Sequence, residues 1–255
     1  MDVRLSVLSK VGGRDRNEDA CGYSTEGDTI CCVLCDGAGG HGGGDVAART
    51  AVDSVLESFA SRPTATPDTI HTLIAEANEA VNRTQLSSRD LSDMRATIVV
   101  VALDANPGIA VWGHVGDSRL YGFRGGYIQC RTRDHSLVQS MLDAGYIDEA
   151  TACHGPSRNV LTGSLGVRDG FEPEIVAQPL SLEPGDAFLL CSDGFWEYVD
   201  EREMESALQR ASSPDDWLAR MEHSVLNRGR KGQDNYSAMA LWYGEVNLAT
   251  QVVMR

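Results

Sequence analysis

This sequence of 255 residues lacks long hydrophobic runs and an excess of basic charge. No apolar stretch approaches the roughly 18 residues that cross a bilayer. Residues 1–7 show no basic segment followed by an apolar one, so we predict no signal peptide. The net charge of −15 disfavours nucleic acid and anionic membranes as partners, because their phosphates attract basic surfaces. We therefore expect a cytoplasmic protein with no membrane span and no nucleic-acid partner.

Internal repeats, low-complexity tracts and linkers are absent as well, which predicts one domain over residues 1–255. The seven cysteines are an odd number, and several lie in apolar runs, where they are typical of small buried side chains in a reducing compartment. Cys32 and Cys35 form a C-x-x-C pair, but without neighbouring ligand residues this pair is a poor zinc or redox motif.

Apolar runs separated by turn residues predict strands that occur in hairpins and helices that occur in pairs. The expected hairpins join 4–10 to 29–35, 97–103 to 109–115, 119–123 to 127–131 and 174–178 to 187–191, and a last strand covers 236–243. The expected helices cover 45–60, a segment after Pro67, 136–144, 201–210 and 214–226. This pattern predicts an α+β fold of antiparallel sheets with helices on their outer faces.

Four aspartates stand where an apolar run meets a tight turn. They are Asp36, Asp117, Asp193 and Asp234. A carboxylate at the end of a buried strand loses hydration, which costs free energy unless a positive charge compensates. One such residue suits a turn, whereas four of them favour a shared site for hard cations.

The first of these aspartates opens a glycine-rich segment, residues 36–45, that leads into a predicted helix. Six glycines in ten residues allow the backbone to approach a ligand closely. Gly37, Gly39 and Gly42 also fit the dinucleotide-binding pattern G-x-G-x-x-G. That alternative requires a second parallel strand that ends in an acidic residue about 20 residues later. It is disfavoured because a second helix is expected there instead.

Glu18 adds a fifth carboxylate to the four aspartates, and no histidine or cysteine cluster accompanies them in the sequence. A ligand set made only of oxygen favours Mg²⁺ or Mn²⁺ over zinc. Two such ions about 4 Å apart acidify a bridging water and stabilise charge on a phosphoryl group. Arg14, just upstream of Glu18, has the planar fork that holds two phosphate oxygens.

Five segments, by their order and spacing, resemble the metal-dependent protein serine/threonine phosphatases of type 2C in their compact bacterial form. They are 14–19 (R-x-x-N-E-D), 36–45 (D-G-x-G-G-H-x-x-G-D), 116–119 (G-D-S-R), 192–194 (S-D-G) and 233–235 (x-D-N). Residues 133–138 and 159–162 are also similar to segments of this family. Each motif is weak alone, but the ordered set is specific and covers nearly the whole chain.

The resemblance implies a central antiparallel β-sandwich flanked by helix pairs, in four αββα layers, with two metal ions at one end between the sheets. It implies that Asp36 bridges the two ions. The Gly37 carbonyl and either Glu18 or Asp19 would complete one of them.

The same resemblance implies that Asp193 and Asp234 hold the other ion. Asp117, together with Asp193, matches a third and weaker metal site of bacterial members. Arg14 matches the arginine that binds phosphate.

One position in the glycine-rich segment departs from the family pattern. Ala38 stands where some members have a histidine that acts as general acid, and His41 does not inherit that role. A metal-bound water is the alternative acid. Residues 146–162 match a flap beside the active site, in which Arg158 would contact substrate, and a plain surface loop is an equally good interpretation.

The remaining histidines receive structural interpretations. His114 lies on an apolar strand, where it is typical of a satisfied core residue. His135 is expected to cap the helix turn that follows it.

The resemblance implies hydrolysis of phosphoserine and phosphothreonine by in-line attack of a bridging hydroxide, without a phosphoenzyme. The sequence accordingly lacks the Cys-x5-Arg pattern of cysteine phosphatases. The segment 31–45 also resembles phosphatases encoded with type VI secretion systems, for which the substrate is a kinase-phosphorylated forkhead-associated scaffold protein. We expect a monomer that opposes a bacterial serine/threonine kinase.

Two alternatives belong to other classes of function. A non-catalytic binding module that has lost its metals is disfavoured, because all five acidic ligand positions are filled. A small-molecule phosphatase with the same metal site stays open, because the sequence shows no readable specificity insertion.

Overall fold

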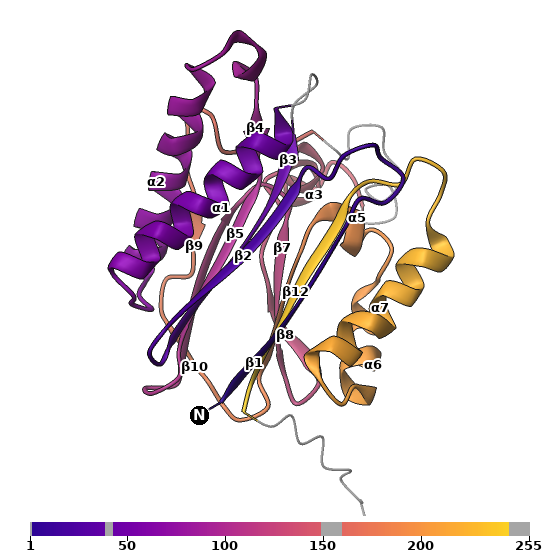
Figure 1. Cartoon of the computed structure of the whole chain (residues 1–255). Coiled ribbons are helices and arrows are strands. Elements are labelled where there is room, and N and C mark those ends of the chain that lie inside the picture. Colours follow the sequence, from indigo (N-terminus) through magenta and orange to yellow (C-terminus); the bar gives the residue numbers. More distant parts are fainter. Residues whose placement is uncertain (1, 39–42, 149–159, 245–255) are drawn as a thin grey trace, which may run out of the picture.

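The computed structural model describes residues 2–38, 43–148 and 160–244. Two antiparallel sheets stack face to face, and helices cover both outer faces (Figure 1). The covering helices are α1 (Gly44–Ser61) and α2 (Pro67–Gln85) on one side, and α6 (Glu201–Arg210) and α7 (Pro214–Arg228) on the other. This is the predicted α+β arrangement of helices outside stacked sheets. None of the helices in the described ranges has the length and hydrophobicity needed to cross a bilayer.

The strand order shows how the chain builds the two sheets. The first sheet has the order β1-β12-β11-β7-β8, with bounds Val3–Lys10, Tyr236–Tyr243, Ala187–Cys191, Arg119–Arg124 and Tyr127–Arg131. The second has the order β10-β6-β5-β3-β2, with bounds Leu180–Ser181, Ile109–Val115, Ile98–Asp104, Thr29–Ala38 and Asp19–Glu26. The short strands β4 (Arg95–Ala96) and β9 (Glu174–Ile175) pair with β3 and β6.

Local capping signals define the starts of three helices. The side chains of Thr66 and Ser213 each accept a backbone N–H at the starts of α2 and α7, and a proline follows each of them. Asp200 and Glu203 form a capping box at the start of α6. The shorter helical elements are α3 (Leu137–Asp143), α5 (Asp193–Trp196) and the 3₁₀ turn η1 (Arg89–Leu91).

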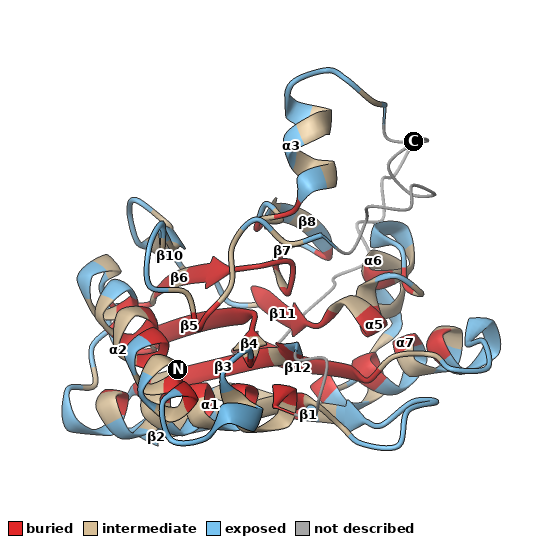
Figure 2. Ribbon diagram, turned by 90° about the horizontal axis from the view of Figure 1, so that it is seen from above, coloured by how far each residue is buried: buried red, intermediate tan, exposed pale blue. Residues whose placement is uncertain are grey.

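The alternation of side chains along β3 explains why this strand is buried on both faces. Cys31, Val33 and Cys35 pack in the core under α1 and α2, whereas Cys32 and Leu34 point into the core between the sheets. Figure 2 shows these central strands as buried, with exposed residues gathered on the helices and loops. Cys32 and Cys35 therefore lie on opposite faces of β3 as free thiols, so they form no common site.

Two of the predicted hairpins are wrong. Residues 4–10 do not pair with 29–35, because β1 pairs with β12 and β3 pairs with β2. Strand β2 is missing from the prediction because Asp19–Glu26 has few large apolar side chains and lies at the edge of its sheet. Residues 174–178 and 187–191 also belong to different sheets, since β9 joins β6 while β11 lies between β12 and β7.

The strand order brings the four aspartates to one end of the sandwich. Strands β3 and β6 are both antiparallel to β5, so they run in the same direction and place Asp36 and Asp117 at the same end of the sheet. In the other sheet, β11 ends beside the start of the antiparallel β12, which places Asp193 and Asp234 at the same end of that sheet.

Candidate metal centre

Asp36 and Asp193 come from opposite sheets, and their side chains share a hydrogen bond. Asp19 lies opposite Asp36 in the register of β2 and β3. It also accepts a 2.9 Å hydrogen bond from Ser192 Oγ, which links the two sheets at this end. The charge of Asp117 acts on Asp36 as well. Four of the residues predicted as metal ligands therefore lie together at the end of the sandwich.

Three carboxyl groups of this cluster have raised pKa values. Burial, followed by the charge of Asp193, raises the pKa of Asp36 well above its usual range. Burial and, less strongly, neighbouring carboxylates raise the pKa of Asp19 to about 7. The pKa of Asp117 is raised to about 8 by burial and then by Asp193. A bound cation would relieve both causes, because it neutralises the charge that burial and repulsion disfavour.

Two carboxylate oxygens near this end are buried and have no hydrogen-bond partner among the described residues. They are Oδ1 of Asp19 and Oδ1 of Asp45, which lies in the first turn of α1. A buried oxygen of this kind costs free energy unless something pairs with it. The residues present thus fit a hard divalent cation such as Mg²⁺ or Mn²⁺, which binds carboxylate and carbonyl oxygens.

The glycines that join β3 to α1 allow Glu18 to approach this cluster. A Cβ atom on Gly44 would lie 2.5 Å from Glu18 Oε2, and one on Gly37 would lie 2.1 Å from the Gly44 carbonyl oxygen. Side chains at either position would clash, so the packing requires glycine. The backbone N–H of Gly37 also donates to the Glu18 carbonyl at 3.1 Å. Burial, with a contribution from Asp45, raises the pKa of Glu18.

Arg14 and Asp234 form an ion pair at the rim of the cluster, with 2.7 Å between Nη2 and Oδ2. Their side chains are 54% and 46% exposed, so solvent reaches both. Asn235 fastens the nearby loop to β12: its Nδ2 donates to two carbonyl groups of residues 11–16, and its Oδ1 accepts the Glu18 N–H, all at 2.8 Å. The loop that carries Arg14 and Glu18 is thereby fixed beside Asp234.

A buried network that the motifs do not reveal holds Asp117 in place. Trp196 Nε1 donates a 2.9 Å hydrogen bond to the Asp117 carbonyl. The guanidinium of Arg119 lies 3.6 Å from the centre of the Trp196 ring. The same guanidinium donates to both carboxylate oxygens of Asp134, at 2.8 and 2.7 Å. The only sequence signal for this network is that Arg119 and Asp134 fall within the family-like segments 116–119 and 133–138.

Arg158 and His41 fall outside the described residues. His114 is buried, as predicted, and its Nε2 lies 2.7 Å from the Arg133 carbonyl oxygen. His135 does not cap the following helix, because the side chain of Ser136 accepts the N–H that begins α3.

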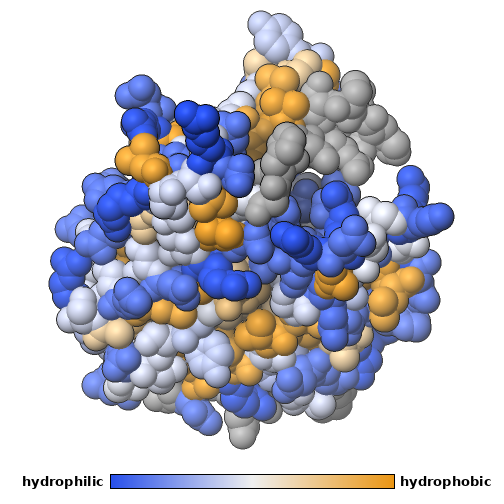
Figure 3. Space-filling model, turned by 45° about the horizontal axis from the view of Figure 1, so that its top comes forward, coloured by the Kyte–Doolittle hydropathy of each residue, from blue (hydrophilic) through white to orange (hydrophobic). Residues whose placement is uncertain are grey.

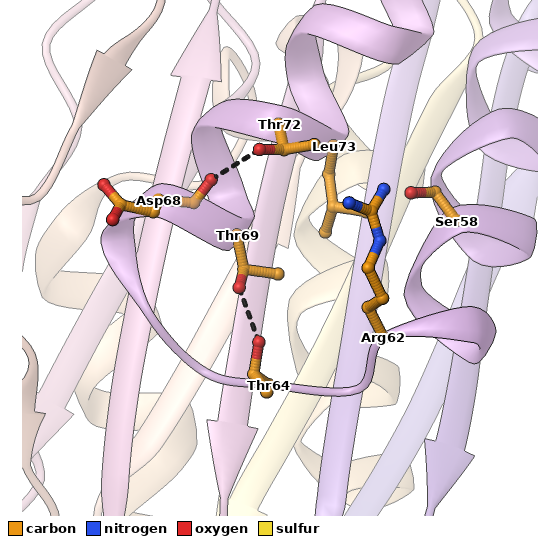
Figure 4. Close-up of a pocket in the computed structure, with 7 residues that line it drawn as sticks. All are labelled: Ser58, Arg62, Thr64, Asp68, Thr69, Thr72 and Leu73. Atoms are coloured by element: carbon orange, nitrogen blue, oxygen red, sulfur yellow. Dashed lines mark hydrogen bonds between the residues drawn. The ribbon is translucent and has the colours of Figure 1, made fainter.

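A small pocket of about 160 Å³ lies beside the C-terminal end of α1 and the start of α2 (Figure 4). It is lined by Ser58, Arg62, Thr64, Asp68, Thr69, Thr72 and Leu73. Helix α1 has 18 residues and is therefore about 27 Å long, which separates this pocket from the cluster. Its arginine is already paired with Glu76 at 3.0 Å. We therefore assign this pocket no part in the chemistry of the cluster.

The face of the molecule that includes the upper end of the sandwich is mainly hydrophilic. In Figure 3, blue side chains dominate this face and orange ones occur in small separate groups. No broad apolar surface is visible there among the described residues. Such a surface suits a polar and charged ligand better than a lipid or an apolar small molecule.

Comparison with known proteins shows matches along most of the chain. Residues 9–230 match the model of the family described as Protein phosphatase 2C. The serine/threonine phosphatase stp of Listeria monocytogenes is 33% identical over 202 residues, which cover 77% of this chain and 79% of that protein.

Two solved structures share the fold. The serine/threonine phosphatase of S. agalactiae has a TM-score of 0.84 and 28% identity, and the match covers 96% of this chain and 100% of that one. PppA, described as a key regulatory component of T6SS in Pseudomonas aeruginosa, has a TM-score of 0.75 and 32% identity, covering 94% and 97%.

The raised pKa values predict how the stability of the metal-free protein depends on pH. Asp19 and Asp117 have pKa values of about 7 and about 8 in the folded state, against 3.8 as the reference value. Groups with a raised folded pKa stabilise the fold at low pH, and this contribution is lost as the pH rises through the folded pKa. In chelator, this contribution should be lost between about pH 4 and about pH 8, so the melting temperature should fall as the pH rises across that range.

Thermal unfolding in chelator at several pH values measures this effect. Asp19→Asn removes one titrating group and should flatten the curve. A melting temperature that stays level or rises across this range in the metal-free wild type would contradict the prediction.

Proposed function

The chain belongs to the protein phosphatase 2C family, and we propose that its carboxylate cluster is a dinuclear Mg²⁺ or Mn²⁺ centre that hydrolyses phosphoserine and phosphothreonine esters. The protein is a metal-dependent protein serine/threonine phosphatase. One observation carries the assignment of the site. The buried Oδ1 of Asp19 has no hydrogen-bond partner among the described residues, and Asp19 lies opposite Asp36, whose pKa is raised by burial and by the repulsion of neighbouring carboxylates.

Asp36 would bridge the two ions in this proposal, and Glu18 or Asp19 would complete one of them together with the Gly37 carbonyl. The pairing of Asp19 with Asp36 across β2 and β3 supports this, as does the approach of Glu18 to the start of α1. When bound, the ions supply Lewis acidity toward phosphoryl oxygens and lower the pKa of a water between them.

Asp193 and Asp234 would hold the second ion, and Asp117 with Asp193 would hold a weaker third one. The shared hydrogen bond of Asp36 and Asp193 supports a common centre. Asp117 lies close enough to Asp36 to influence its pKa, and its backbone is fixed by Trp196, which suits an accessory position.

Arg14 would bind two oxygens of the transferring phosphoryl group. Its 2.7 Å contact with Asp234 uses one donor and orients the guanidinium at the rim, which leaves further N–H groups for substrate. In this position it would neutralise the negative charge that develops during in-line displacement. We also retain Arg158 as a proposed substrate contact.

We further propose that residues 1–255 form one catalytic domain and that the enzyme is a cytoplasmic monomer. The pairing of β1 with β12 supports one domain, because it joins the first and the last strand of the described residues in one sheet. The family match over residues 9–230 supports it as well. On the one face that Figure 3 shows, the hydrophobic groups are scattered, so this face offers no broad apolar contact surface for a second copy.

A role in the control of type VI secretion is the narrower proposal. It is supported by the 32% identity to PppA, the T6SS component of Pseudomonas aeruginosa. The substrate would be a forkhead-associated scaffold protein phosphorylated by a bacterial serine/threonine kinase, and this phosphatase would reverse that modification.

Removal of the metals or of Asp36 should abolish the activity. With Mn²⁺ and para-nitrophenyl phosphate, Asp36→Asn should lower kcat at least about 100-fold, because metal stabilisation of the transition state amounts to several kcal/mol. Chelator should abolish the activity of the wild type, and added Mn²⁺ should restore that activity. Asp53→Asn, at an exposed position of α1, is the matched control and should behave as wild type. Activity that persists in chelator or in Asp36→Asn would disprove the two-metal mechanism.

Asp117→Asn should separate turnover from occupancy of the core metal pair. We expect kcat to fall about tenfold or more, since an accessory charge at the transferring group is lost. Mn²⁺ binding by equilibrium dialysis should still give two ions per chain. Loss of a core ion, or turnover equal to that of wild type, would contradict the accessory role.

The narrower proposal is tested with phosphoprotein substrates. The purified enzyme should dephosphorylate a phosphothreonine-bearing forkhead-associated protein at least about tenfold faster, by kcat/KM, than unrelated phosphoproteins. Equal rates would remove the assignment to this substrate and leave the phosphatase activity itself intact.

A further inference from the structure

Two histidines and a glutamate lie together at the end of β6, outside the carboxylate cluster. The potential ligand atoms of His114, His135 and Glu174 all lie within 4.8 Å of one another. The three residues come from β6, from the connection between β8 and α3, and from β9. Neither the phosphatase chemistry nor the family-like motifs assign them a function.

The backbone holds all three residues in place. His114 and Glu174 are direct partners in the antiparallel pairing of β6 with β9, so their side chains leave the same face of the sheet. The N–H of His135 donates to the Gly116 carbonyl at 2.9 Å, and its carbonyl accepts from Thr162 at 2.8 Å. The two imidazole rings have their centroids 4.6 Å apart.

The surroundings of His114 favour the protonation state that metals bind. Its Nε2 lies 2.7 Å from the Arg133 carbonyl oxygen, which can only accept a hydrogen bond, so Nε2 carries the proton and Nδ1 has the free lone pair. A metal-binding histidine usually donates its other ring N–H to a carbonyl or carboxylate in this way. Burial also lowers the pKa of His114, which keeps the ring neutral near neutral pH.

The contact of His135 with Glu174 does not have the geometry of an ordinary ion pair. Their Nε2 and Oε2 atoms are 3.7 Å apart, which is longer than a charge-assisted hydrogen bond. The distance is close to the edge of about 3.4 Å between ligands of a tetrahedral ion with bonds of 2.0–2.1 Å. The side chain of Glu174 is 57% exposed, so the site has a path from solvent and room for water as a fourth ligand.

We propose that His114, His135 and Glu174 form a separate binding site for Zn²⁺. Two imidazole nitrogens and one carboxylate oxygen are a ligand set that favours zinc over Mg²⁺, whereas the carboxylate cluster favours the opposite. A bound ion would clamp β9 and the connection before α3 onto β6. Because the His135 N–H bonds to Gly116, this clamp would also stiffen the backbone immediately before Asp117.

Zinc binding in the presence of excess Mg²⁺ tests the proposal, because Mg²⁺ occupies the carboxylate cluster. Competition with a chromophoric chelator should show one tightly bound Zn²⁺ per chain. Glu174→Gln and His135→Gln should each weaken this binding at least about tenfold. The exposed His223→Gln is the matched control and should bind zinc as wild type does.

A spectroscopic measurement distinguishes the two kinds of site. Co²⁺ added to the Mg²⁺-loaded wild type should give the visible absorption of a tetrahedral ion, and Glu174→Gln should lose it. Glu174 is largely exposed, so this variant should fold normally, which its zinc-free melting temperature verifies. Equal zinc affinity in wild type, Glu174→Gln and His135→Gln, or a purely octahedral Co²⁺ spectrum in wild type, would overturn the proposal.

Discussion

Asp36 and Asp19 share one end of the sandwich with Asp193, whose charge disfavours the ionisation of both. The strand order imposes this proximity, because β2 begins, and β3 and β11 end, at the same end of the sandwich. A fold that gathers carboxylates in this way is destabilised at neutral pH unless cations bind there. Cations bound in the proposed metal centre would neutralise these carboxylates and remove the destabilisation. The same ions would serve the phosphatase reaction.

Residues around the cluster hold the backbone at this end of the sandwich in place. Asn235 ties the loop of Arg14 to the start of β12, and the Arg119–Asp134 pair steadies Trp196 against the Asp117 carbonyl. The buried bidentate pair is a positioning device, because both partners are largely removed from solvent. The cluster of His114, His135 and Glu174 contacts the same end of β6, because the His135 N–H donates to the Gly116 carbonyl. The end of β6 is therefore held from two sides.

The sequence predicted the parts of this arrangement that have local signals. An apolar run followed by Asp-Gly or Gly-Asp marks the strand ends that carry Asp36 and Asp117. Most strands, most helices and the α+β arrangement of helices outside antiparallel sheets followed from periodicity and turn residues. Pairing of β1 with β12 had no such signal, because the partners stand at opposite ends of the chain. Strand β2 was missed because an edge strand needs little apolar surface. The pair of Arg119 and Asp134 resembles surface charge in the sequence, whereas the fold leaves only 15% and 10% of these side chains exposed and places Arg119 over the Trp196 ring. Which carboxylates hold which ion stays a prediction.

Anomalous diffraction at the manganese edge, from crystals grown with Mn²⁺, would locate the ions of the proposed centre. We expect two strong peaks on either side of Asp36, one within ligand distance of Glu18 or Asp19 and the other beside Asp193 and Asp234. Peaks that are absent from this end of the sandwich, or a single ion without contact to Asp36, would contradict the proposed centre.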